Sequence, residues 1–197
     1  MSATDHIVLK SLIIGLLRSH AVQTINFTAA SVRIDHQLYS DLVNLVLADR
    51  LHLGIDPTLR SRGYRGMYHP DPGRNLLDLP EASLGTTLDA SYAVHELTHA
   101  AVDMMNLPHS RGLHRTETEG IAYIAQRVYS RNIRADPIQR HTPHIFHVAD
   151  AIAARIIKAR PGVYHVSEDE IRRMRNAVGQ HPKYYPYRGQ RAPSDGI

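Results

Sequence analysis

The central stretch of the sequence, residues 86–102, reads TTLDASYAVHELTHAAV. It opens with Thr86, followed three residues later by Asp89, a pattern typical of a capping box at a helix start. Apolar residues then recur with helical spacing, and Pro108, which a helix interior does not tolerate, soon follows. We therefore expect a helix that begins after Thr86 and ends near Asn106.

Two histidines lie four residues apart in this helix, so the side chains of His95 and His99 share one face, about one turn from each other. Two imidazoles in this arrangement can bind one zinc ion. Glu96 directly follows the first histidine, which places its carboxylate beside the metal without making it a ligand. A carboxylate there can take a proton from a zinc-bound water. The pattern predicts that His95 and His99 are metal ligands and that Glu96 is the catalytic base.

A catalytic zinc needs a third protein ligand. The downstream candidates are His109, His114, Glu117 and Glu119. The two glutamates lie on one predicted helix, about Thr116–Arg131, and point about 200° apart around it. Glu117 continues the apolar face of that helix, whereas Glu119 aligns with small and polar residues, which suit the surroundings of a hydrated metal. We therefore assign Glu119 as the third ligand and keep Glu117 as the alternative.

The segment Ala93–Ala100 resembles the active-site helix of thermolysin and other gluzincin metallopeptidases. In that family the third ligand is a glutamate on a following helix, and Glu119 follows His99 with 19 residues between them. The resemblance covers only about residues 93–126. It implies a minimal zincin-like domain with one zinc ion per chain, a hydrolase that cleaves peptide bonds in a protein or peptide substrate.

One position departs from the family pattern. Thermolysin-like enzymes orient the first histidine with an aspartate four residues after the ligand glutamate, and here that position is Tyr123. Either the groups around the ligands differ in this chain, or Asp103 supplies the missing contact. The metzincin pattern, which requires glycine and histidine after the second ligand, is excluded because those positions are Val102 and Met105.

The remaining chain predicts one α+β domain, mostly helical, over residues 1–180, with an extended or flexible tail over residues 181–197. Further helices are expected at about Ile7–Leu17, from Asp35 or Ser40 to Leu51, at Pro143–Ala159 and from Ser167 to Val178. Strands are expected within Thr24–Ile34 and in a hairpin formed by Tyr64–His69 and Asn75–Leu79, after a loop at Gly54–Arg62. The hairpin precedes the active-site helix, and the resemblance implies that Asn75–Leu79 is the edge strand along which a substrate lies.

Four residues are candidates for hydrogen bonding to the oxyanion of a tetrahedral intermediate: Tyr123, His144, His147 and Tyr164. The sequence does not choose among them. His144 and His147 also have the spacing of a metal pair, but no acidic residue lies between them or directly beside them, so we expect no second metal site.

Composition narrows the possible functions. The chain has 197 residues, no cysteine and a net charge of +4, so a metal must be bound by histidine and carboxylate. The basic residues are dispersed along the chain rather than gathered in blocks, which argues against nucleic acid as a partner. No apolar run is long enough for a membrane span, and the Ile7–Leu17 segment is a poor signal peptide. These features predict a cytoplasmic protein where it is made, of undetermined oligomeric state.

Two alternative functions remain open. A zincin-like module without catalysis could bind zinc structurally together with a protein partner or nucleic acid, and a protease of this size could also be an effector or toxin delivered by specialised secretion. Glu96 discriminates against the first alternative, since a structural zinc site needs no base.

Overall fold

The computed structural model describes residues 2–71, 74–104, 112–135, 142–187 and 189–190. Most of them are helical and the strands form two small sheets, which confirms the predicted α+β class. The helices are α1 (Ala3–Arg18), α2 (His20–Gln23), α3 (His36–Leu47), α4 (Thr58–Ser61), α5 (Thr87–Met104), α6 (Arg115–Asn132), α7 (His144–Lys158), α8 (Glu168–Gln180) and the 3-10 helix η2 (Tyr185–Tyr187). The strands are β1 (Phe27–Ala29), β2 (Val32–Ile34), β3 (Leu51–Ile55), β4 (Met67–Asp71), β5 (Arg74–Leu79) and β6 (Tyr164–His165).

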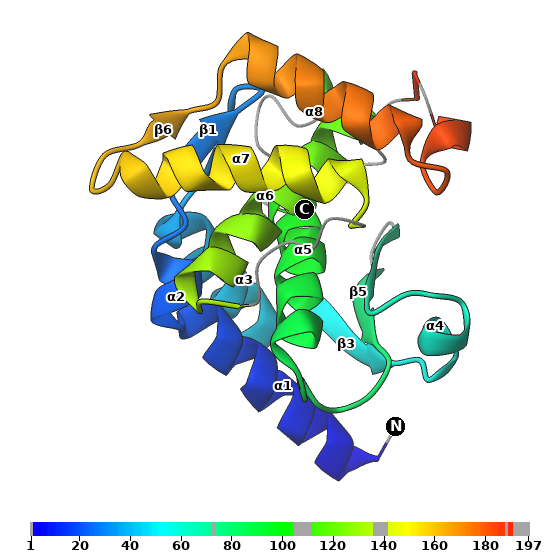
Figure 1. Cartoon of the computed structure of the whole chain (residues 1–197). Helices are drawn as coiled ribbons and strands as arrows, with labels where there is room; N and C mark the ends of the chain where they lie inside the picture. The colour runs from blue at the N-terminus through cyan, green and yellow to red at the C-terminus, as the bar shows by residue number, and fades with distance from the viewer. Residues whose placement is uncertain (1, 72–73, 105–111, 136–141, 188, 191–197) are drawn as a thin grey trace.

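Helix α5 runs through the middle of the molecule (Figure 1). It packs against α6, α3 and the strands β4 and β5. A helix covered on this many sides has to be apolar or small over most of its surface, and Leu97, Ala100 and Ala101 are fully buried. Its polar residue Thr98 is 1% exposed and is hydrogen-bonded to the hydroxyl of Tyr39 on α3 at 2.9 Å. The helix that carries the candidate site is thus held in the core.

The sheet beside α5 has the strand order β3–β5–β4. Strand β5 pairs in parallel with β3 and antiparallel with β4, so the predicted hairpin is confirmed. The prediction that Asn75–Leu79 is an edge strand is wrong, because β3 occupies the other side of β5. Among the described residues, β4 is the edge strand that faces α5. The second sheet, β2–β1–β6, lies near the end of α7 (Figure 1).

Strand β3 was not expected from the sequence, which predicted a helix continuing to Leu51. Helix α3, capped by Asp35, instead ends at Leu47. The backbone of Asp49 then has a φ of 53°, in the left-handed region, which a right-handed helix cannot continue. After this turn the buried side chain of Leu51 begins the alternation of a strand.

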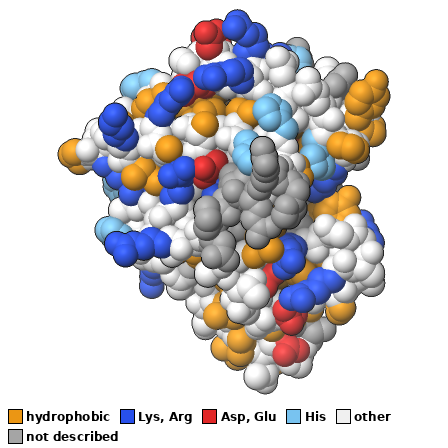
Figure 2. Space-filling view, viewed as in Figure 1, with side chains coloured by type: hydrophobic (Ala, Val, Ile, Leu, Met, Phe, Trp, Pro, Cys, Tyr) orange, Lys and Arg blue, Asp and Glu red, His pale blue; other side chains and the backbone are white. Residues whose placement is uncertain are grey.

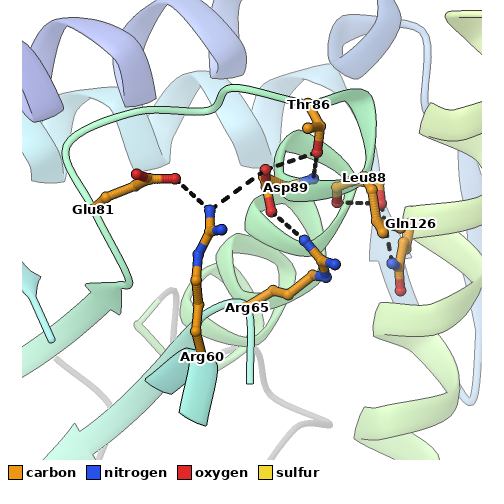
Figure 3. Close-up of polar contacts among 8 residues, drawn as sticks. Arg60, Arg65, Glu81, Thr86, Leu88, Asp89 and Gln126 are labelled. Atoms are coloured by element: carbon orange, nitrogen blue, oxygen red, sulfur yellow. Dashed lines mark hydrogen bonds and ion pairs between the residues drawn. The ribbon is translucent and has the colours of Figure 1, made fainter. Parts of the chain in front are cut away.

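A polar network fixes the beginning of α5 (Figure 3). The Thr86 hydroxyl accepts a hydrogen bond from the backbone N–H of Asp89 at 3.0 Å and donates to its carboxylate at 2.7 Å, so the predicted cap is present. Arg65, which precedes β4, donates to the same carboxylate at 2.6 Å, and Arg60 bridges Asp89 and Glu81. Burial raises the pKa of Asp89, but the hydrogen bonds from Thr86 and Arg65 outweigh it and hold the pKa below its usual value. The network ties the start of α5 to the chain before β4.

The chain after α8 folds back onto the protein, which differs from the tail expected over residues 181–197. Tyr184 is 2% exposed, and a 3-10 helix follows it at Tyr185–Tyr187. Further on, the backbone carbonyl of Gln190 accepts a hydrogen bond from the backbone N–H of Arg115, at the start of α6, at 2.9 Å. The remainder of the predicted tail, residues 191–197, lies outside the described residues.

The surface carries dispersed charge. Figure 2 shows Lys and Arg side chains scattered over one face, with acidic side chains among them. Among the described residues, no helix combines the length and the apolar character that a membrane span requires.

Candidate metal centre

The two histidines of α5 point their Nε2 atoms toward each other, and these atoms are 3.2 Å apart. The rings meet edge to face, with centroids 4.9 Å apart. His95 is 3% exposed and the His99 side chain 17%. One turn of helix therefore places two nitrogen donors at one buried point, as the spacing predicts.

Helix α6 contributes the third group, Glu119. Its Oε2 atom lies 3.4 Å from Nε2 of His95 and 3.6 Å from Nε2 of His99. His95, His99 and Glu119 are the one group among the described residues with the composition and spacing to hold a metal ion. Oε2 is buried and has no hydrogen-bond partner within the described part of the chain. A buried carboxylate oxygen normally has such a partner, so this atom is free to bind a cation.

Charge couples the three groups. Burial favours the neutral form of Glu119, but the charge of His99 and the close approach of both imidazole rings outweigh it, and the pKa of Glu119 lies well below its usual value. Burial acts to lower the pKa of His99, yet the charge of Glu119 raises it overall. The cluster thus contains a carboxylate that stays ionised while buried, which suits cation binding.

The alternative ligand, Glu117, lies in the first turn of α6, and its side chain points back toward the residue that caps this helix. Its Oε2 accepts a hydrogen bond from the backbone N–H of His114 at 2.8 Å, and its Oε1 lies 3.3 Å from Arg175 on α8. These contacts are those of a helix cap and an inter-helix ion pair. His114 also lies at this cap, and His109 falls outside the described residues.

Glu96 lies next to the cluster but outside it. Its carboxylate accepts a hydrogen bond from the backbone N–H of Tyr68 on the edge strand β4 at 3.0 Å. The neighbouring Gly66 admits this arrangement, since a Cβ there would lie only 3.2 Å from Cγ of Glu96. The negative charge of Glu96 contributes to the raised pKa of His99. A carboxylate is therefore held between the cluster and the edge strand.

The groups around the ligands differ from the thermolysin-like pattern. Nδ1 of His95 is buried without a hydrogen-bond partner in the described chain, so Asp103 does not orient that ring. Asp103 instead accepts a hydrogen bond from the hydroxyl of Tyr68 at 2.6 Å. Tyr123, at the position where thermolysin-like enzymes have aspartate, packs its ring against His95 edge to face, with centroids 4.5 Å apart. Ring packing takes the place of a carboxylate contact.

Of the four candidate oxyanion residues, only Tyr123 has a described contact with the cluster. Tyr164 donates hydrogen bonds to Glu170 at 3.0 and 3.1 Å, on the β6–α8 side. His144 and His147 line a groove of about 440 Å³ between α7 and α8, and neither belongs to a metal-binding group in the described chain.

The sequence did not single out Tyr184. Its hydroxyl lies 2.9 Å from the hydroxyl of Tyr123, and its side chain is buried. The Glu119 carboxylate is close enough to contribute to the raised pKa of Tyr184, after the larger effect of burial. Pro182 and three neighbouring tyrosines read as a solvated tail, and no local pattern links them to a site some 60 residues earlier in the chain.

Comparison of the chain with known proteins finds no match to a protein family, to a curated protein or to a solved structure.

Proposed function

We propose that this protein is a zinc-dependent metallopeptidase with the metal ligands His95, His99 and Glu119. The spacing of the ligand atoms supports zinc. In a tetrahedral site with bonds of about 2.0–2.1 Å, neighbouring ligand atoms are about 3.3 Å apart. The three ligand atoms here are separated by 3.2, 3.4 and 3.6 Å. Two imidazoles and one carboxylate, in a chain without cysteine, form the donor set of a catalytic zinc site.

Bound in this cluster, zinc would polarise the carbonyl group of a peptide bond and lower the pKa of a bound water. Glu96 is the proposed general base. Its carboxylate takes a proton from the attacking water, whose oxygen bonds to the carbonyl carbon. Glu96 then delivers that proton to the leaving nitrogen as the carbon–nitrogen bond breaks.

The observation that carries the proposal is the position of Glu96, which adjoins the cluster without joining it. The backbone N–H of Tyr68 holds the carboxylate, and its charge acts on His99. A zinc site that only stabilises a fold has no use for a base beside the ligands. The arrangement therefore favours catalysis over a structural role.

The test compares the wild type with Glu96→Gln. We expect one zinc ion per chain in both proteins, and loss of proteolysis in the variant, measured by labelling the new peptide N-termini that each protein produces in a cell lysate. Glu168→Gln, at an exposed position at the start of α8, is the matched control and should cleave like the wild type.

Two outcomes would overturn the proposal in different ways. Absence of zinc from both the purified and the zinc-reconstituted wild type would remove the metal centre. Zinc binding with identical peptide ends from the wild type and Glu96→Gln would leave a metal-binding module without general proteolysis. In that case filter binding over a salt series would test the nucleic-acid alternative, since such binding weakens steeply with salt.

A further inference from the structure

Tyr68, on the edge strand β4, is hydrogen-bonded to helix α5 at two places. Its backbone N–H donates to the Glu96 carboxylate at 3.0 Å, and its hydroxyl donates to Oδ2 of Asp103 at 2.6 Å. Glu96 and Asp103 are seven residues apart on α5, which is about two helical turns, so their side chains share the face that packs against β4. One residue of the strand is therefore held to the helix through both its backbone and its side chain.

The hydroxyl of Tyr68 lies among buried polar groups. Besides Asp103 it contacts Oδ1 of Asn75, on the neighbouring strand β5, at 2.6 Å, and both of these residues are buried. A carboxylate removed from water destabilises the folded chain unless hydrogen-bond donors reach it, and bonds to a charged group are the stronger ones. The hydroxyl is thus a firm anchor for the side chain of Tyr68.

The position of the backbone N–H of Tyr68 depends on that anchor. Among the described strands β4 pairs with β5 alone, so backbone hydrogen bonds hold it from one side. On the other side, where Glu96 lies, contacts with α5 supply the hold. A shift of the strand at this residue would move the donor that fixes the Glu96 carboxylate.

We propose that the Tyr68 hydroxyl, through Asp103, fixes the backbone N–H that orients the Glu96 carboxylate. Tyr68 is then a positioning residue for the proposed base, and Asp103 supports the base rather than a histidine ring. The inference rests on the proposed role of Glu96 in catalysis. The contact itself is measurable in the metal-free protein, where no activity is needed.

Amide hydrogen exchange, followed for each residue by NMR on the metal-free protein, measures the contact directly. Glu96→Ala removes the acceptor, and the N–H of residue 68 should then exchange about 10–100-fold faster, the range for loss of a hydrogen bond to a charged group. Tyr68→Phe keeps the ring and the backbone N–H and removes only the hydroxyl. We expect it to accelerate exchange at residue 68 about 10-fold, and Asp103→Ala, which removes the acceptor on α5, to do the same.

Tyr39→Phe is the matched control. Tyr39 is a fully buried tyrosine whose hydroxyl is also hydrogen-bonded to α5, at Thr98, on a different face of the helix from Glu96. Its variant should lose stability as Tyr68→Phe does, but leave the exchange rate at residue 68 unchanged. With a peptide substrate identified from its new N-terminus, Tyr68→Phe should lower kcat about 10-fold at unchanged KM and zinc content, a part of what a general base contributes, and the control should not.

Equal exchange rates at residue 68 in the wild type and in Tyr68→Phe would contradict the proposal. So would an equal acceleration in Tyr39→Phe, because the Tyr68 hydroxyl would then act only through overall stability. Faster exchange in both Tyr68→Phe and Glu96→Ala, in a protein that cleaves no peptide bond, would overturn the proposed function and leave the positioning of the carboxylate intact.

Discussion

A buried side-chain hydrogen bond joins α5 and α6, and Ser91→Ala should destabilise the protein by breaking it. Ser91 lies on α5 one turn before His95, and Gln126 lies on α6 after Glu119. Nε2 of Gln126 donates to the Ser91 hydroxyl at 3.2 Å (Figure 3). Gln126 is 1% exposed, and its Oε1 is buried without a hydrogen-bond partner among the described residues. Removing the serine hydroxyl therefore leaves the whole amide unpaired.

The expected magnitude follows from that unpaired amide. A buried polar group left without a partner costs about 1–3 kcal/mol, and a loss of about 2 kcal/mol lowers the Tm of a chain of this size by about 4–8 °C. Urea denaturation and thermal melting of the metal-free protein measure both quantities. Ser130→Ala is the matched control: Ser130 is also buried and also contacts Gln126, but it donates to the backbone carbonyl at 2.9 Å, and its removal unpairs no amide. We expect the control to lose less than about 1 kcal/mol.

A double variant tests the reasoning directly. Combining Ser91→Ala with Gln126→Leu removes both partners and leaves no unpaired polar group, so most of the lost stability should return. If the double variant is no more stable than Ser91→Ala alone, the loss does not come from the unpaired amide and the argument is refuted.

Two further predictions concern carboxylates. Asp89→Asn should cost about 1.5–3 kcal/mol at neutral pH, the range for hydrogen bonds to a charged group. Because the folded pKa of Asp89 lies below its unfolded value, this stability is present above about pH 4 and is lost as the pH falls through the folded pKa. Urea denaturation over a pH series should show the two proteins converging in acid, and a constant difference would contradict the assignment. Glu119→Ala should weaken zinc binding strongly in chelator competition, whereas Glu117→Ala should keep zinc and lose about 0.5–2 kcal/mol of stability as a helix cap; the reverse result would make Glu117 the ligand.

The sequence predicts those features of the site that depend on the spacing of residues within one helix. The cap formed by Thr86 and Asp89 sets the start of α5, and four-residue spacing then places His95 and His99 on one face. Helix phase also separates Glu119 from its neighbour two residues earlier, because side chains two positions apart point in nearly opposite directions. These inferences need no knowledge of how distant segments pack.

Prediction from the sequence fails where a structure depends on contacts between segments that are distant along the chain. Strand β3 forms because Asp49 turns the chain and β5 offers a partner, and that partner also makes β5 a central strand. Tyr184 comes to lie beside Tyr123 on α6, and α8, which precedes it, packs closely on α6 at Gly120, where a Cβ would lie 2.9 Å from the side chain of Met174. Neither outcome has a signature in the residues adjacent to it.

The balance of polar groups in the cluster favours the binding of a cation. Nδ1 of His95 and Oε2 of Glu119 are buried without hydrogen-bond partners in the described chain, and Glu119 is held ionised. Such groups oppose folding unless another interaction offsets them. Native proteins keep such arrangements mainly at functional sites. A divalent cation would neutralise the carboxylate and accept both Nε2 atoms at once, so metal binding should stabilise the folded protein. The residues that weaken the metal-free core are the ones that could hold the ion.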